Sequence, residues 1–346
     1  MPSFFLLKKM KALGIIVTVL LISFQSSAQW VMIWNDEFDN STLDNSKWVN
    51  DVGGNGWGNN EAQYYTAGNA NLTIANGEAT FRAKAEQFGT NEYTSAKIIS
   101  KNLFDIQYGK IEGRMKCPMG KGLWPAFWML GSNIDSVSWP MCGEIDVMEH
   151  INSETKIHGT AHWDNVGHQY LGGIINTDPT AFHTFTIMWD STYIKWYMDD
   201  QLYYLLNITN GTNGTDEFHK EFYLILNLAV GGNWPGYPDG TTNFPADFVV
   251  DYIRVYKDQA ELTINELAVS NLNVYPNPTN DILSLEGLNG TTSFIYSIYS
   301  LNGEKLAESK LKIENSIDVS FLTNGNYILE IKNEDGTTKR ISFSKN

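Results

Sequence analysis

Residues 110–116 read Lys-Ile-Glu-Gly-Arg-Met-Lys, so that apolar or small side chains alternate with charged ones. A two-residue period is typical of a β-strand with one face in a core and the other in water. Residues 193–198 alternate in the same way, and Asp199-Asp200 is typical of a hairpin turn into a strand at 202–204. Further strands are predicted at 222–228 and 248–256.

The same region has no stretch with a helical period over three turns, and its strands do not alternate with helices. Many strands without such spacing predict an all-β fold of two packed antiparallel sheets. A sandwich of this kind can curve, which leaves a concave face for an extended ligand.

The composition excludes several classes of protein. The 346 residues include 24 Lys and Arg against 39 Asp and Glu, a formal net charge of −15, whereas nucleic-acid binding needs a basic face. We therefore expect no nucleic-acid partner. An apolar fraction of 42% with 18% charged residues is that of a folded globular protein rather than a disordered one.

The N-terminus has the order of a signal peptide. Three basic residues, Lys8, Lys9 and Lys11, precede an apolar run at 12–24 and small residues at 26–28. The run is shorter than the roughly 20 residues that span a bilayer, so we predict a signal peptide over residues 1–28, with an N-terminal anchor as the alternative.

A change in composition predicts two modules after the signal peptide. All 11 Trp precede residue 258, and residues 29–267 contain 14 basic and 30 acidic side chains, against 7 and 9 in residues 268–346. We place one module at 29–258, a linker at 259–267 and a second module at 268–346. The second module has the pattern of short strands and turns, at 294–299, 301–304, 327–331 and 341–343.

The most informative segment, residues 143–150, reads Gly-Glu-Ile-Asp-Val-Met-Glu-His. Glu144 and Asp146 are two positions apart and share a strand face, whereas Glu149 is five positions from Glu144 and would face the other way. One extra residue in a β-bulge restores Glu149 to the first face, and we place the bulge at Val147-Met148. The three acids then form a row, while Ile145 and one of the two bulge residues point into the core.

Three like charges in a row are unfavourable unless their pKa values separate, which is the arrangement that acid–base chemistry uses. Retaining glycoside hydrolysis needs two carboxyl groups about 5–5.5 Å apart, one as nucleophile and one as proton donor. A solvated charged face would interleave Lys or Arg, and none is present. A calcium loop would place its ligands on flexible turns rather than on a strand. Catalysis is therefore the favoured interpretation.

Tryptophans surround this segment in the sequence. Leu-Trp-Pro-Ala-Phe-Trp-Met-Leu at 123–130 and Trp139-Pro140 precede it, and Trp163 and Trp234-Pro235 follow it. Indole faces can stack on sugar rings, although a Trp in a sandwich is more often part of the core. Trp-Pro pairs and Gly-flanked Trp fit loops or strand ends, where a ring meets a ligand.

The cysteines and histidines leave alternatives open. Export makes Cys117 and Cys142 candidates for one disulfide, and two reduced buried thiols are the alternative. His158 and His162 share a strand face, but a zinc pair there lacks a third ligand, so we expect one of them to hydrogen-bond a sugar or a catalytic carboxylate. We expect His150 to lie in the core or behind the carboxylates.

Residues 30–257 resemble glycoside hydrolase family 16, specifically its laminarinase-like β-glucanases. The matching blocks are 34–38, 93–97, 108–112, 123–130, 144–149, 222–235 and 250–256. The resemblance implies a concanavalin A-like β-jelly roll, with retaining cleavage of internal β-1,3 or mixed β-1,3/1,4 bonds of laminarin- or lichenan-type glucans. Glu144 matches the nucleophile, Glu149 the general acid/base and Asp146 the assisting carboxylate.

The same resemblance implies two further sets of residues and no cofactor for catalysis. The glucan-binding set is Asn60, Trp124, Trp128, Trp139, His162 and Trp163. The second set, Glu37, Gly77 and Asp251, matches a structural calcium site on the convex side, with a purely structural role as the alternative.

The C-terminal module resembles the type A sorting domain of the type IX secretion system. The matching parts are Tyr-Pro-Asn-Pro at 275–278, Leu-Thr-Asn-Gly-Asn-Tyr at 322–327 and the end at 345–346. The resemblance implies a small β-sandwich that the secretion machinery recognises, and a protein that crosses the periplasm to the medium or the cell surface. A carbohydrate-binding module is the alternative, which the absence of Trp there disfavours. We expect a monomer whose partners are a β-glucan and that machinery.

Two other functions are weighed against the glucanase. The first is the same fold acting on a galactan of the agarose or carrageenan type, which the scarcity of basic residues disfavours for sulfated chains. The second is a non-catalytic glucan-binding protein, which would have no use for paired Glu residues. The sequence does not separate hydrolysis from transglycosylation.

Overall fold

The structure, a computed structural model, describes residues 29–259, 272–287, 294–311, 315–333 and 338–346. The predicted signal peptide and residues 260–267 of the predicted linker lie outside the described residues. Within the described residues, no helix combines the length and the apolar character needed to cross a membrane.

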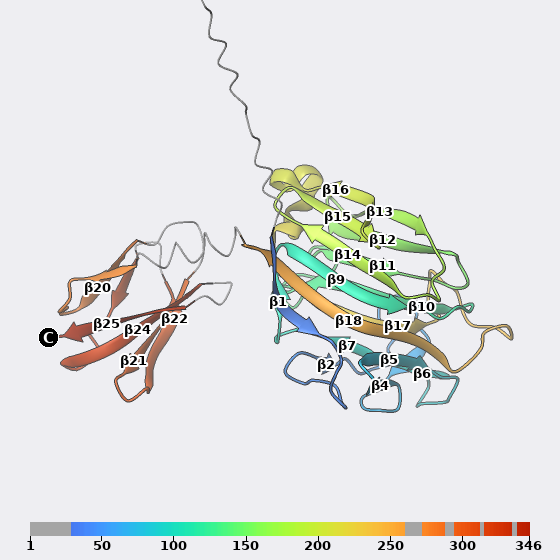
Figure 1. Ribbon diagram of the computed structural model, residues 1–346, viewed down its shortest axis with the longest axis horizontal. Helices are drawn as coiled ribbons and strands as arrows, with labels where there is room; N and C mark the ends of the chain where they lie inside the picture. Colours follow the sequence, from blue (N-terminus) through green and yellow to red (C-terminus); the bar gives the residue numbers. More distant parts are fainter. Residues whose placement is uncertain (1–28, 260–271, 288–293, 312–314, 334–337) are drawn as a thin grey trace, which may run out of the picture.

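One sheet of the larger module has eight strands (Figure 1). They are β1 (Trp30–Asp36), β4 (Leu72–Ala75), β5 (Glu78–Ala83), β9 (Gly109–Lys116), β14 (His183–Trp189), β15 (Tyr193–Met198), β16 (Gln201–Asn207) and β18 (Ala246–Asp258). Their order is β16-β15-β14-β9-β18-β5-β4, and β1 also pairs with β18. All of these pairings are antiparallel.

The second sheet also has eight strands and carries the site described below. They are β2 (Val49–Asn50), β7 (Lys97–Ile99), β8 (Asp105–Ile106), β10 (Leu123–Gly131), β11 (Glu144–Glu149), β12 (Lys156–Asp164), β13 (His168–Asn176) and β17 (Phe222–Val230). Their order is β13-β12-β11-β10-β17-β7-β2, and β8 also pairs with β17. A short parallel pair, β3 (Gln63–Tyr65) and β6 (Tyr93–Ser95), and one 3-10 segment, η1 (Thr209–His219), complete the module.

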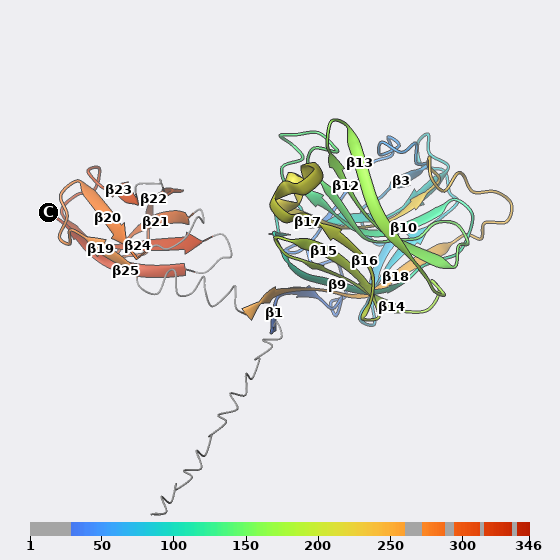
Figure 2. The same ribbon diagram turned by 90° about the horizontal axis from the view of Figure 1, so that it is seen from above.

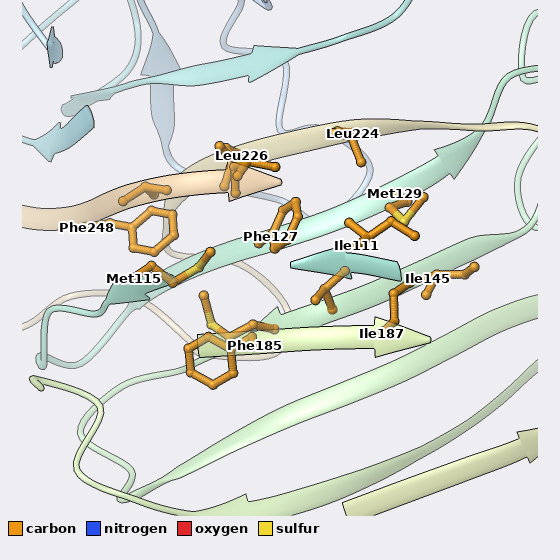
Figure 3. Close-up of a cluster of buried hydrophobic side chains, with 14 of the residues drawn as sticks. Ile111, Met115, Phe127, Met129, Ile145, Phe185, Ile187, Leu224, Leu226 and Phe248 are labelled. Atoms are coloured by element: carbon orange, nitrogen blue, oxygen red, sulfur yellow. The ribbon is translucent and has the colours of Figure 1, made fainter. Parts of the chain in front are cut away.

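The two sheets pack their inner faces into one hydrophobic core (Figure 3). Ile111 and Met115 of β9 lie in it with Phe127 and Met129 of β10, all with no exposed surface. Lys110, on the other face of β9, is only half-buried. The alternation at 110–116 therefore predicted this strand and its buried face correctly, and the predicted two-sheet fold is confirmed.

The predicted hairpin is also present. Asp199 and Asp200 join β15 to β16 with φ values of 46° and 64°, the left-handed backbone that a tight two-residue hairpin turn requires. The strands predicted at 222–228 and 248–256 lie within β17 and β18, and every residue of β17 is buried.

The described C-terminal residues form two small antiparallel sheets (Figure 2). One consists of β19 (Asn273–Tyr275), β20 (Ile282–Glu286) and β23 (Ser316–Asp318), and the other of β21 (Phe294–Ser300), β22 (Lys305–Lys310), β24 (Gly325–Asn333) and β25 (Thr338–Lys345). They have a hydrophobic core of their own, which includes Leu283, Ile298 and Phe343. Three of the predicted strands lie within β21, β24 and β25, and residues 301–303 form the turn after β21.

Candidate active site

Strand β11 carries the three acidic residues and is bulged at the predicted place. Asp146 and Met148 face consecutive residues of β10, so Val147 between them has no partner there. The register with β12 shifts at the same point, between Asp146 and Glu149. The extra residue returns Glu149 to the face of Glu144 and Asp146, and all three side chains line one hollow. The predicted bulge and row of acids are confirmed.

Both bulge residues point into the core. Val147 and Met148 are buried there together with Ile145, whereas the residue pattern predicted only one of the two in the core. That expectation was wrong because a bulge sets two residues opposite one, so neither of them has to return to the cleft face. Met148 also contacts Cys117, with the two sulfur atoms 3.7 Å apart, which packs the bulge against the core.

Each glutamate accepts a hydrogen bond from an indole N–H. Trp139 Nε1 donates to Glu144 Oε2 at 3.0 Å, and Trp124 Nε1 donates to Glu149 Oε1 at 2.9 Å. The two rings come from the loop before β11 and from β10. Such bonds favour the ionised carboxylate and fix the direction in which each carboxyl group points.

Asp146 lies between the glutamates and beside His162. Its Oδ2 atom is 3.2 Å from His162 Nε2, and the same nitrogen is 3.8 Å from Glu144 Oε1. Burial is the main cause that raises the pKa of Glu144, Asp146 and Glu149, and the charge of Asp146 raises the pKa of both glutamates further. Because three such charges cannot coexist in a buried row, the site retains a proton near neutral pH, as a pair of acid and base groups requires.

Glu144 and Glu149 line a cleft of about 700 Å³, and Asp146 lies beside them in a smaller hollow that all three acids line. The walls of the cleft are mainly aromatic, and the aromatic lining residues are Trp57, Trp124, Trp128, Trp139, Trp234, Tyr170, His158, His162 and His168. Trp139 and Trp234 are 43% and 42% exposed, unlike the fully buried core residues Trp48, Trp189 and Trp196. Open indole faces of this kind offer flat apolar surfaces to sugar rings.

Four of the six predicted glucan-binding residues line this cleft: Trp124, Trp128, Trp139 and His162. Asn60 is exposed and its side chain donates to Asn233 Oδ1, while its neighbour Asn59 lines the cleft. A glucan-binding role for Asn60, beside the cleft rather than in its lining, stays a prediction.

Trp163 was predicted wrongly. It is 3% exposed, lies in the hydrophobic core and donates its indole N–H to the carbonyl oxygen of Asn213. The physical reason is strand parity, because Trp163 follows His162 directly on β12 and adjacent residues of a strand face opposite ways.

Other residues line the cleft that the sequence did not predict. Lys97 of β7 lies 4.2 Å from the ring centroid of Trp57 and 3.0 Å from Asp51 Oδ2. His168 and Tyr170 of β13 line the cleft beside β12. Trp57 could have been predicted because it lies in a Gly-rich stretch at 53–58. His168 and Tyr170 could have been predicted because they are two positions apart on one strand, β13. Nothing in the sequence indicates that Lys97 lies in the cleft.

Burial and contacts also decide the predictions for the two cysteines and for the other histidines. Cys117 and Cys142 are both free and buried, so the structure has the reduced thiols rather than the disulfide. His150 is fully buried, as expected, and its Nε2 lies 2.8 Å from the carbonyl oxygen of Glu154. His158 lies within hydrogen-bond distance of the Glu154 carboxylate, whereas His162 is the histidine beside the acidic row.

The residues matched to a calcium site do not fit that ion through their side chains. Arg254 binds both carboxylate oxygens of Glu37 at 2.8 Å, and Arg114 pairs with the carboxylate of Asp251. Gly77 lies near the Glu37 carbonyl oxygen, about 4.0 Å from the position a Cβ would take. Arginines therefore pair with both carboxylates, and a calcium site built from backbone carbonyl oxygens of these three residues stays a prediction.

An antiparallel sheet whose bulged strand presents three carboxyl groups beside an aromatic cleft defines a β-sandwich glycoside hydrolase. Residues 55–254 match the model for glycosyl hydrolases family 16, and the chain belongs to that family.

Individual relatives agree with this assignment. The chain is 41% identical over 244 residues to "Beta-glucanase" of Rhodothermus marinus, which covers 66% of this chain and 85% of that one. It is 40% identical over 237 residues to "Clotting factor G alpha subunit" of Tachypleus tridentatus, covering 66% of this chain but only 34% of that one. The catalytic domain of an endo-1,3-beta-glucanase (laminarinase) from Thermotoga petrophila superposes with a TM-score of 0.63 and 41% identity, over 67% of this chain and 100% of that one.

Residues 273–343 match a second family, the secretion system C-terminal sorting domain. The resemblance to a sorting module is therefore confirmed, and the protein is one that is secreted or displayed on the cell surface.

Proposed function

We propose that the larger module is a retaining endo-β-glucanase that cleaves internal β-1,3 or mixed β-1,3/1,4 bonds of laminarin- or lichenan-type glucans. The observation that carries the proposal is the row of Glu144, Asp146 and Glu149 on one face of the bulged β11, inside an aromatic cleft. Two glutamates with raised pKa values, each oriented by an indole N–H, supply a nucleophile and a proton donor.

In this mechanism Glu149 acts first as an acid and then as a base. It gives its proton to the leaving glycosidic oxygen while the Glu144 carboxylate attacks the anomeric carbon, which forms a glycosyl-enzyme. Glu149 then takes a proton from water, and that water cleaves the intermediate to release Glu144. Asp146, buried between them, assists by keeping the donor protonated.

The cleft favours a neutral glucan over a sulfated galactan. Lys97 is the one Lys or Arg among the described residues that line it, and its ammonium is already 3.0 Å from Asp51 Oδ2. A sulfated chain needs several free cations, whereas indole faces suit the apolar faces of glucose rings. Transfer of the glycosyl group to a sugar instead of water is a variant of the same mechanism.

A non-catalytic glucan-binding protein is the competing function. It would use the aromatic walls but not the acids, and burying three carboxyl groups without using them lowers stability at no benefit. Release of reducing ends from laminarin, lichenan and agarose, measured side by side, separates the three possibilities. We expect release from the first two and little from agarose.

Variants of the acids test the roles. Glu144→Ala and Glu149→Ala should each lower turnover on laminarin by at least about 10³-fold while the circular dichroism spectrum is unchanged. Near-normal hydrolysis by either folded variant would refute the assignment.

We further propose that the C-terminal module is the address read by the type IX secretion machinery, and that the enzyme works as a monomer. Deletion of residues 272–346 should leave the glucanase in the periplasm of the native host, and light scattering should give the mass of one chain.

A further inference from the structure

Two members of the acidic row and a neighbouring histidine form a cluster of metal-ligating side chains that the proposed catalysis does not require. Among the described residues, one group of three His, Cys, Asp or Glu side chains has its ligand atoms within 4.8 Å of one another, and it consists of Glu144, Asp146 and His162. Two oxygens and one imidazole nitrogen form a donor set that suits Zn²⁺ better than Ca²⁺, which takes six to eight oxygens.

The spacing of these atoms agrees with tetrahedral coordination. Zinc binds His nitrogen and carboxylate oxygen at about 2.0–2.2 Å, which places two ligands of a tetrahedron about 3.4 Å apart. Asp146 Oδ2 and His162 Nε2 are 3.2 Å apart, and His162 Nε2 and Glu144 Oε1 are 3.8 Å apart. The oxygens of Glu144 and Asp146 lie within 4.8 Å of each other, so the Glu144 side chain would move towards the other two ligands to complete the set.

An unpartnered atom points into this set independently of its spacing. Asp146 is 2% exposed, and its buried Oδ2 has no hydrogen-bond partner even though His162 Nε2 lies nearby. The two atoms are therefore close together, but their relative orientation is not that of a hydrogen bond. Buried carboxylate oxygens are ordinarily satisfied, so this atom has the capacity to bind a cation.

Residues around the three ligands orient them as in known metal sites. His162 Nδ1 lies 2.8 Å from His168 Nε2, so with Nε2 on a metal the other nitrogen keeps its proton and donates it to His168. Trp139 Nε1 donates to Glu144 Oε2, which leaves Oε1 to face the ligand cluster. Glu144 and His162 line the cleft, so water from it could supply a fourth ligand to a bound ion.

We propose that the cleft binds one Zn²⁺ ion through Glu144, Asp146 and His162, and that this ion and a glucan exclude each other. Zinc occupies the nucleophile of the proposed reaction, so the bound ion inhibits the enzyme reversibly. The inhibitory part rests on the proposed function, whereas the binding part does not.

Calorimetric titration of the full chain, without a histidine tag, with zinc chloride alone tests the site. We expect one ion per chain, an affinity at least about 100-fold weaker in His162→Gln, and a loss of about 10–100-fold in His168→Phe. His158→Gln is the matched control, because His158 lines the same cleft outside the cluster. Equal zinc affinity in wild type and His162→Gln, or no binding by the wild type, overturns the proposal.

Two further measurements keep the outcome clear. If His162→Gln does not fold, as judged by circular dichroism, Asp146→Asn takes its place with the same expected loss. Repeating the titration on Glu149→Ala, which keeps the three ligands and does not consume the sugar, with a saturating laminarin oligosaccharide should weaken zinc binding at least tenfold, and unchanged binding overturns mutual exclusion. This readout needs no turnover, so a chain that binds zinc but cleaves no glucan contradicts the proposed function and leaves the metal site standing.

Discussion

Glu144 and Glu149 face the same cleft although five positions separate them on β11, because Val147 lies between them without a partner on β10. Deletion of Val147 should turn Glu149 towards the core and abolish laminarin hydrolysis, with a large loss of stability from burying a carboxyl group there. Reducing-end assays and thermal unfolding measure both effects.

Met148→Leu is the matched control for this deletion. It keeps the length of the bulge and nearly the volume of the side chain, so it should cost less than about 1.5 kcal/mol of stability and keep most of the activity. A deletion variant that hydrolyses laminarin like the wild type would show that the bulge does not align the acids.

The Ala variants of the two glutamates should respond differently to added azide. In Glu149→Ala, azide should restore turnover of an aryl β-glucoside substrate with retention at the anomeric carbon, because it attacks the glycosyl-enzyme from the side that water uses. In Glu144→Ala, azide should replace the nucleophile and give the inverted product. Proton NMR of the glycosyl azide distinguishes the two, and the reverse pattern would exchange the roles of the residues.

Trp124→Phe tests how the indole sets the pH dependence. Burial raises the pKa of Glu149 to about 8, and the Trp124 N–H bond opposes that rise. Removing the bond raises the pKa further, so the alkaline limb of the kcat/KM profile should move to higher pH, because that limb follows loss of the Glu149 proton. We expect kcat/KM at its optimum to fall about tenfold. An alkaline limb that moves down in pH contradicts this role.

Glu149→Gln should stabilise the fold at alkaline pH. A carboxyl group with a raised pKa keeps its proton in the folded state after the unfolded chain has lost it, so wild-type stability falls as pH rises from about 4.5 towards 8. Glutamine does not titrate, so the variant should gain about 1–2 kcal/mol on the wild type between pH 5 and pH 8, with Tm rising by about 2–4 °C per kcal/mol. Tryptophan fluorescence follows this transition in the larger module, which contains all 11 Trp. Parallel Tm curves for the two proteins over this range contradict the prediction.

The sequence predicted what depends on strand periodicity. The two sheets, the hairpin at Asp199-Asp200 and the bulge at Val147 follow from alternation and parity, which local residues determine. The same alternation predicts that Trp163 faces away from the cleft, because it follows His162 directly on the strand. Local pattern does not determine which distant segments of the chain meet: Lys97 and Trp57 are 40 positions apart in sequence and come together only through the fold.

Substitution of Trp163 should lower stability, whereas substitution of Trp234 should weaken glucan binding. Trp163 is 3% exposed in the core, so Trp163→Ala should cost about 3–5 kcal/mol of stability while the KM of the folded enzyme for laminarin is unchanged. Trp234 is 42% exposed, lines the cleft and packs edge-on against Trp124, with ring centroids 5.5 Å apart. Trp234→Ala should therefore leave Tm within a few degrees of the wild type and raise KM about three- to tenfold, equivalent to about 0.7–1.4 kcal/mol of lost sugar contact. Thermal unfolding and laminarin kinetics on both variants check this, and a raised KM in Trp163→Ala with wild-type stability would restore that residue to the binding set.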